Sequence, residues 1–132
     1  MRLRACLWPS TRTEEHELET AEMLRNPDQH AVFLSVAEDG NLEGFIELQI
    51  RSYAEGCGPG PVPCIEGWYV EPHKRRQGIG RSLVEVAEQW ARQRGFKEMY
   101  SDTEIENELG QEAHRRLGYR VVETIVCFRK DL

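Results

Sequence analysis

The sequence predicts a mixed α/β sheet with helices packed on its faces. Segments in which apolar residues recur at helical spacing alternate with short runs rich in β-branched residues, in the order α-β-β-β-α-β-α-β. The chain has 132 residues, of which 39% are hydrophobic and 30% are charged. A chain of this size can bury one core without disulfides or metal, so we expect residues 1–132 to form a single domain.

The first half of the chain predicts one helix and one hairpin. The helix covers residues 13–26, with Thr13 as a candidate N-cap, acidic residues in its first turn and an Asn-Pro pair at its end. The strands, at 31–37 and 42–50, flank an Asp-Gly turn. This pattern is typical of a β-hairpin.

The second half predicts strands and helices in alternation. A loop rich in glycine and proline covers 54–63 and leads into a strand at 64–70. The clearest helix spans 81–94, because apolar residues such as Leu83 and Ala87 share one of its faces. The remaining predicted elements are a strand at 96–101, a helix at 107–117 and a closing strand at 119–129.

Composition limits the classes of partner. The chain carries 17 Lys and Arg against 23 Asp and Glu, a formal charge of −6. An acidic surface repels nucleic acid and anionic membranes and suits a cationic partner, although moderate negative charge also serves solubility alone. We find no signal peptide and no apolar run of the ~20 residues that a membrane span needs, so we expect a cytoplasmic protein.

The cysteines and histidines predict no metal site. Cys6, Cys57, Cys64 and Cys127 form no Cys-x-x-Cys pair, and the histidines lie at no zinc-binding spacing. Scattered cysteines in a chain of this size indicate reduced, intracellular thiols.

A strand that leads through a basic, glycine-containing turn into an amphipathic helix predicts an anion-binding site. The turn reads Arg75-Arg76-Gln77-Gly78-Ile79-Gly80-Arg81. The first N–H groups of a helix lack intrahelical partners and carry partial positive charge. Gly78 and Gly80 would let a diphosphate reach these donors, and the arginines add bidentate donors. The P-loop signature is absent, and the Gly-x-Gly-x-x-Gly dinucleotide pattern fails at Leu83.

The pattern Arg75-x-x-Gly78-x-Gly80 between a strand and a helix resembles the acetyl-CoA signature of the GNAT acyltransferase superfamily. Other stretches, over nearly the whole chain, are similar to its aminoglycoside 6′-N-acetyltransferases. These stretches are Leu7-Trp8-Pro9, Glu66-Gly67-Trp68-Tyr69-Val70, Ser101–Asn107, His114–Tyr119 and Glu123–Lys130. The chain departs from that family by starting near the end of the family's first helix, so the first strand is expected to be missing. Tyr100 and Gly110 stand where the family has Ala and Ser.

The resemblance implies a GNAT fold in which two strands splay apart and hold acetyl-CoA. Backbone groups of Trp68 and Val70 would bind the pantetheine arm, and residues Arg75 to Arg81 would bind the pyrophosphate. The expected cofactor-binding residues are Trp68, Val70, Arg75, Arg76, Gln77, Gly78, Ile79, Gly80, Arg81, Ser82 and Asn107. An amine would attack the thioester directly, without an acyl-enzyme.

Two carboxylates, Glu66 and Asp102, are the candidate bases. By the resemblance they lie on neighbouring strands near the thioester, where they could accept the proton of the amine and also bind a polycationic substrate. The alternatives are a solvent-facing edge-strand carboxylate for Glu66 and a helix N-cap for Asp102. Glu71 is a further candidate base, or else a charge partner of Arg75 or Lys74.

His114 occupies about the place where many superfamily members carry a tyrosine that protonates the leaving thiolate, and histidine can donate a proton near neutral pH. Packing or solvent exposure of His114 is an equal alternative. Trp8 and Tyr53 are expected beside the substrate, because aromatic faces pack against sugar rings, although either could belong to the core. For Asn107 the alternative to cofactor contact is a helix N-cap.

We therefore expect an acetyl-CoA-dependent aminoglycoside 6′-N-acetyltransferase that acts in antibiotic resistance, and a homodimer by the resemblance. One alternative is a GNAT enzyme for another amine, such as a polyamine or a protein amine. Another is a non-catalytic acetyl-CoA-binding module, which the presence of Glu66, Asp102 and Gly78 disfavours.

Overall fold

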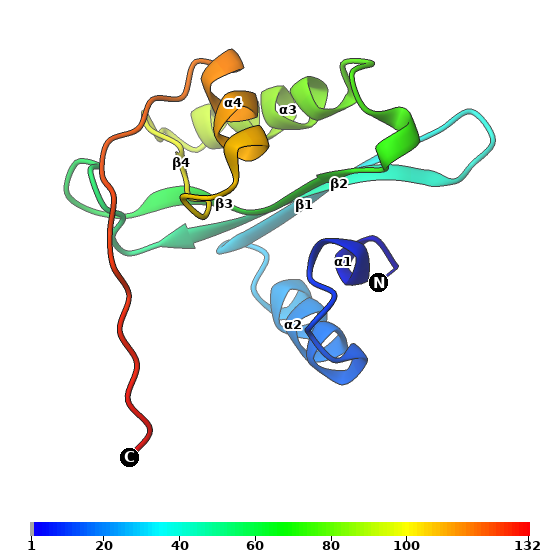
Figure 1. Ribbon diagram of the computed structural model, residues 1–132. Helices are drawn as coiled ribbons and strands as arrows, with labels where there is room; N and C mark the ends of the chain where they lie inside the picture. Colours follow the sequence, from blue (N-terminus) through cyan, green and yellow to red (C-terminus); the bar gives the residue numbers. More distant parts are fainter. Residues whose placement is uncertain (1) are drawn as a thin grey trace.

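The computed structural model of the chain describes residues 2–132. Its sheet has the strand order β1-β2-β3-β4, in which β1, β2 and β3 are antiparallel neighbours and β4 runs parallel to β3 (Figure 1). The strands are β1 (His30–Val36), β2 (Leu42–Arg51), β3 (Val62–Val70) and β4 (Tyr100–Ser101). The helices are α1 (Arg2–Leu7), α2 (Thr13–Arg25), α3 (Ile79–Gln93) and α4 (Glu108–Arg116), with a 3-10 turn, η1, at Pro72–Lys74. This architecture confirms the predicted fold class.

Helices cover both faces of the sheet, α1 and α2 on one side and α3 and α4 on the other (Figure 1). On the α3 side, Leu83, Val84 and Ala87 pack against Ile46 and Leu48 of β2 and form the main core. The helical spacing of the apolar residues in α3 is therefore satisfied by burial against the sheet. Within residues 2–132, no helix combines the length and apolar character required to cross a membrane.

The start of α2 corrects one detail of the sequence prediction. The helix begins at Thr13, but its N-cap is Arg12, whose side chain makes no capping hydrogen bond. Thr13 was the wrong candidate because Arg12 is the last extended residue, with φ −70° and ψ 152°, and Thr13 is already helical. Glu14 and Glu15 lie in the first turn, where negative charge stabilises a helix.

The predicted hairpin between β1 and β2 is confirmed. The Ala37 N–H donates to the Asn41 carbonyl at 2.8 Å, and Gly40 adopts a φ of +86°, which glycine tolerates without strain. Ala37 thus belongs to the turn, and β1 ends at Val36.

The C-terminal third departs most from the sequence prediction. β4 has only 2 residues, Tyr100–Ser101, instead of the expected strand at 96–101. The expected closing strand at 119–129 does not form, and the tail leads away from the sheet (Figure 1). Its apolar side chains, such as Val126 and Phe128, are exposed. A strand needs a hydrogen-bonded neighbour, and residues 2–132 provide none for this tail.

Candidate active site

Strands β3 and β4 separate after two paired positions, Cys64 with Tyr100 and Ile65 with Ser101. β3 continues through Glu66–Val70, and this part of its outer edge has no strand partner within residues 2–132. The two strands therefore splay, as the resemblance implied.

The free edge of β3 presents backbone groups of Trp68 and Val70. The Glu71 N–H donates to the Glu43 carbonyl at 2.8 Å, and hydrogen-bonded pairs alternate with non-bonded pairs along an antiparallel ladder. Trp68 and Val70 thus direct their N–H and C=O groups away from β2. The Val70 carbonyl already accepts a hydrogen bond from Arg75 Nε at 2.8 Å.

The turn after β3 forms a cradle at the start of α3. Arg76 and Gly78 both adopt left-handed backbone conformations, with φ of 63° and 85°. A Cβ on Gly78 would meet nothing within 4 Å, whereas a Cβ on Gly80 would lie 3.3 Å from the Trp68 ring. Gly78 therefore leaves space above the free N–H groups of the helix, and Gly80 lets α3 lie close to Trp68.

The polar side chains predicted for the pyrophosphate gather at this turn. α3 begins at Ile79, two positions before the predicted start at Arg81. Arg81 donates to the Arg116 carbonyl at 3.3 Å, and Gln77 donates to the His73 carbonyl at 3.3 Å. Exposed cations beside unpaired helix N–H groups fit a diphosphate, so the residues present fit coenzyme A at this position.

Glu66 and Asp102 come together at the point where β3 and β4 part. The register of β2 and β3 shifts there and leaves Glu66 without a partner residue on β2. Arg51, the last residue of β2, binds both Glu66 oxygens, with Nε at 2.8 Å and Nη2 at 2.9 Å. The Arg51 Nη1 lies 3.6 Å from Asp102 Oδ2. Glu66 is thus no water-facing edge carboxylate, and Asp102 is no helix N-cap.

Tyr100 and Glu55 complete this cluster. The Tyr100 hydroxyl lies 3.0 Å from Glu55 Oε2 and 3.1 Å from Asp102 Oδ2, and the Arg51 guanidinium lies 5.3 Å from the centre of the Tyr100 ring. Burial, followed by the hydrogen bond to Glu55, raises the pKa of Tyr100, so the hydroxyl keeps its proton. The sequence prediction missed Arg51, Glu55 and Tyr100. The only signal was the departure from the family's Ala at position 100.

His114 contacts the same region from α4. Its Nδ1 lies 2.6 Å from the Gly110 carbonyl and must therefore carry a proton, so its Nε2 accepts the Ser101 hydroxyl proton at 2.7 Å. The ring packs edge-on against Trp68 at 5.5 Å. Asn107 caps α4 through the Gly110 N–H, which was the structural alternative for this residue.

A cleft of about 710 Å³ lies between α2 and the sheet and reaches Glu66. It is lined mainly by polar and acidic side chains together with Trp8. Gly67 makes room for that ring, because a Cβ there would lie 2.5 Å from Trp8. Glu71, by contrast, pairs with Arg2 rather than with Arg75 or Lys74. Tyr53 is 63% exposed and is not part of this lining.

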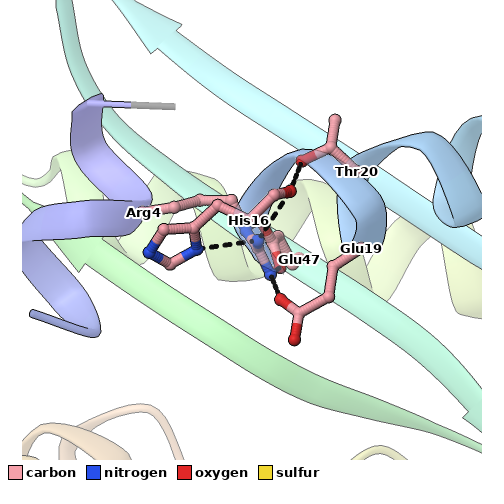
Figure 2. Close-up of polar contacts among 5 residues, drawn as sticks. All are labelled: Arg4, His16, Glu19, Thr20 and Glu47. Carbon is pink, nitrogen blue, oxygen red and sulfur yellow. Dashed lines mark hydrogen bonds and ion pairs between the residues drawn. The ribbon is translucent and has the colours of Figure 1, made fainter. Parts of the chain in front are cut away.

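Figure 2 shows a cluster of side chains at this cleft, in which Arg4, His16 and Glu47 are largely buried. Arg4 contacts Glu47 at 2.6 Å, Glu19 at 2.7 Å and His16 Nδ1 at 3.1 Å, and Thr20 donates to the His16 carbonyl at 2.8 Å. Burial raises the pKa of Glu47, although the contact with Arg4 opposes this. Within residues 2–132, no group of three or more His, Cys, Asp or Glu side chains is placed to hold a metal ion.

Comparisons with known proteins agree with this geometry. The family model described as acetyltransferase (GNAT) family matches residues 1–119. The aminoglycoside N(6′)-acetyltransferase type 1 of Klebsiella aerogenes is 47% identical over 132 residues, which cover 98% of this chain and 87% of that protein. The Serratia marcescens protein of the same name is 39% identical, with 98% and 89% covered.

Solved structures of aminoglycoside 6′-N-acetyltransferases have the same fold as this chain. The structure of AAC(6′)-Iy in complex with the bisubstrate analogue CoA-S-monomethyl-acetylneamine superimposes with a TM-score of 0.92 at 34% identity, covering 98% of this chain and 88% of that one. The apo structure of AAC(6′)-IG from Acinetobacter haemolyticus gives 0.91 at 32% identity, with 99% and 89% covered. The family match, the relatives and the splayed sheet together establish that this chain belongs to the GNAT family of acetyltransferases.

Proposed function

We propose that this chain transfers the acetyl group of acetyl-CoA to the 6′-amino group of aminoglycoside antibiotics and thereby confers resistance. The observation that carries the proposal is the pair of carboxylates, Glu66 and Asp102, where β3 and β4 part, next to an acidic cleft with an aromatic wall at Trp8. A substrate with several ammonium groups on sugar rings suits such a surface. The names of the relatives support the 6′ position.

In this mechanism, bound acetyl-CoA supplies the thioester carbonyl that the amine attacks. The nitrogen lone pair would form the new C–N bond, the nitrogen would lose a second proton to water, the C–S bond would break, and coenzyme A would leave as a thiolate. Because an ammonium has no lone pair, the amine must first lose a proton, which Asp102 or Glu66 accepts directly or through water. Asp102 is the more accessible of the two, with 61% of its side chain exposed against 27% for Glu66.

Residues around the turn and α4 hold the cofactor and return a proton. Trp68 and Val70 would bind the pantetheine arm through their backbone groups, and the turn from Arg75 to Ser82 would hold the pyrophosphate. With both ring nitrogens protonated, His114 would donate its Nε2 proton to Ser101, and the Ser101 hydroxyl would pass its own proton to the thiolate. Asn107 would reach the cofactor from the start of α4, and Tyr53 would border the substrate.

A thiol-release assay tests the proposed function. Purified protein is mixed with acetyl-CoA and kanamycin or tobramycin, and free thiol is followed over time. We expect turnover with these substrates and none with an aminoglycoside that carries a hydroxyl at the 6′ carbon. Binding of acetyl-CoA without thiol release from any amine would instead support a non-catalytic module, and release with another amine would support a different GNAT activity.

We further propose that the 132 residues form one domain of a cytoplasmic homodimer with no nucleic acid or membrane partner. The exposed apolar residues of the tail, among them Val121, Val126 and Phe128, follow a strand-like pattern without a neighbour within residues 2–132. A second copy could supply that neighbour. Sedimentation of the protein and of Phe128→Asp tests this: we expect a dimer that the substitution weakens.

A further inference from the structure

At the end of β2, the guanidinium of Arg51 lies near three carboxylates, those of Glu55, Glu66 and Asp102. Arg51 binds Glu66 through two hydrogen bonds and approaches Asp102, while Glu55 lies on the other side of Tyr100. A bidentate guanidinium–carboxylate pair fixes both groups in direction as well as in distance. The orientation of Glu66 is therefore set by Arg51.

Tyr100 fixes the position of Arg51 from below and contacts Asp102. Its ring lies beneath the guanidinium, a favourable cation–π arrangement. Its hydroxyl has a single proton and two carboxylate neighbours, so it can donate to Glu55 or to Asp102 but not to both at once. The contact with Glu55 is the shorter of the two, at 3.0 Å against 3.1 Å, and the hydrogen bonds to its own backbone and to Tyr100 lower the pKa of Glu55.

Asp102 is consequently short of donors. When Tyr100 donates to Glu55, Asp102 retains among residues 2–132 only Arg51 Nη1 at 3.6 Å, beyond the usual length of a hydrogen bond. We propose that Arg51 is a positioning residue of the amine site, which holds Glu66 in a fixed direction and leaves Asp102 open to the incoming amine. This inference rests on the proposed function and deepens it.

The chemical reason is the proton transfer. The attacking amine gives one proton to a carboxylate, so that carboxylate must be ionised and directed at the nitrogen. Loss of the two hydrogen bonds from Arg51 would let Glu66 turn away from that direction. Without Arg51, the negative charges of Glu66 and Asp102 would still be present to bind the polycationic aminoglycoside.

The test compares Arg51→Gln and Arg51→Lys with the wild type and with Arg12→Gln. Arg12 is an exposed arginine that precedes α2, and its substitution changes the net charge equally. For Arg51→Gln we expect kcat to fall about 100-fold, the loss typical of a misplaced reacting group. Aminoglycoside affinity, measured by calorimetry without acetyl-CoA, should stay equal or become tighter. A fall in kcat without weaker aminoglycoside binding separates a positioning role from a structural one.

Arg51→Lys keeps the charge but not the bidentate geometry, so we expect it to restore only part of kcat. A second variant, Tyr100→Phe, keeps the ring under Arg51 and removes only the hydroxyl. We expect it to lower kcat by up to about 10-fold, because Asp102 and Glu55 lose their shared donor.

Other outcomes would overturn the inference. Wild-type kcat in Arg51→Gln would remove any role in positioning. A lower melting temperature with weaker aminoglycoside binding would assign Arg51 a purely structural role. If the wild type acetylates a different amine, the proposed function fails alone, and the same variants are compared on that amine. If it acetylates none, both proposals fail.

Discussion

Two arginines of this molecule are each placed between two carboxylates, and they differ in their access to water. Arg4 lies between Glu47 and Glu19 under the sheet, where its side chain is 11% exposed and that of Glu47 is 6% exposed (Figure 2). Arg51 lies between Glu66 and Asp102, and its side chain is 32% exposed. Each cluster contains one residue of β2. Glu47 and Arg51 lie four positions apart on this strand, so their side chains share one face of the sheet.

The difference separates a structural ion pair from an accessible one. Under the sheet, His16 Nδ1 must accept from Arg4, because a guanidinium can only donate, and His16 is itself buried. Protein groups alone therefore satisfy Arg4, so this ion pair needs no ligand to complete it. At the strand ends, water already reaches Asp102, so a substrate ammonium can join that cluster without the unfolding of any element.

The largest effect is expected at the buried cluster. Arg4→Met would leave Glu47 buried without its cation, and removal of one partner of a buried pair costs about 3–5 kcal/mol. Urea unfolding at pH 8 measures the loss of unfolding free energy. The double variant Arg4→Met/Glu47→Leu is the control, because it leaves no unpaired charge at this pair and should recover most of the loss. Equal losses in both variants would contradict this account.

At the accessible cluster, we expect an effect on turnover instead. Asp102→Asn removes a carboxylate that can accept the amine proton, so kcat/KM should fall about 100-fold, the lower end for general base catalysis. The melting temperature should hardly change, because the side chain is mostly exposed. Glu106→Gln, an exposed position with the same change of charge, serves as the control. Wild-type turnover in Asp102→Asn would leave Glu66 as the base.

A smaller effect distinguishes the two clusters by pH. Burial raises the pKa of Glu47, so the folded state binds its proton more tightly than the unfolded state, and stability falls as pH rises through that pKa. Without Arg4, this pKa rises further. The penalty of Arg4→Met should therefore shrink, by at least about 1 kcal/mol, between pH 8 and pH 5.5. Urea unfolding of variant and wild type at both pH values checks this, and a constant difference would show that Glu47 does not take up the proton.

Local pattern was enough to predict the parts of the fold that are set by neighbouring residues. The spacing of Leu83 and Ala87 gave α3, and the Asp-Gly pair gave the hairpin, because both depend on contacts within a few residues. Local pattern could not predict whether the closing strand forms. Residues 119–129 have strand-like composition, but they have no neighbouring strand to pair with among residues 2–132. Propensity alone does not make a strand.

At the candidate site, too, the sequence pattern did not reveal contacts between residues that are distant in the chain. Glu66 and Asp102 were predicted as candidates through the motifs that contain them, and the structure places Glu66 in β3 and Asp102 directly after the neighbouring strand β4. Arg51 contacts them from positions 15 and 51 residues away, and nothing in the sequence around it indicates a partner. The register shift that leaves Glu66 unpaired is a property of two strands together, so only the structure reveals why Arg51 can reach it.

The smallest effect is expected for an ion pair in open water, which calibrates the other two. Arg116 of α4 lies 3.2 Å from Glu112. This is an ion-pair distance, as in the other two clusters, but the Arg116 side chain is 70% exposed. Exposed pairs of this type contribute about 0.3–0.5 kcal/mol, because water solvates both charges almost as well as they solvate each other. Arg116→Gln should therefore change the urea unfolding free energy by no more than about 0.5 kcal/mol. A loss as large as that of Arg4→Met would mean that exposure is not what separates these ion pairs.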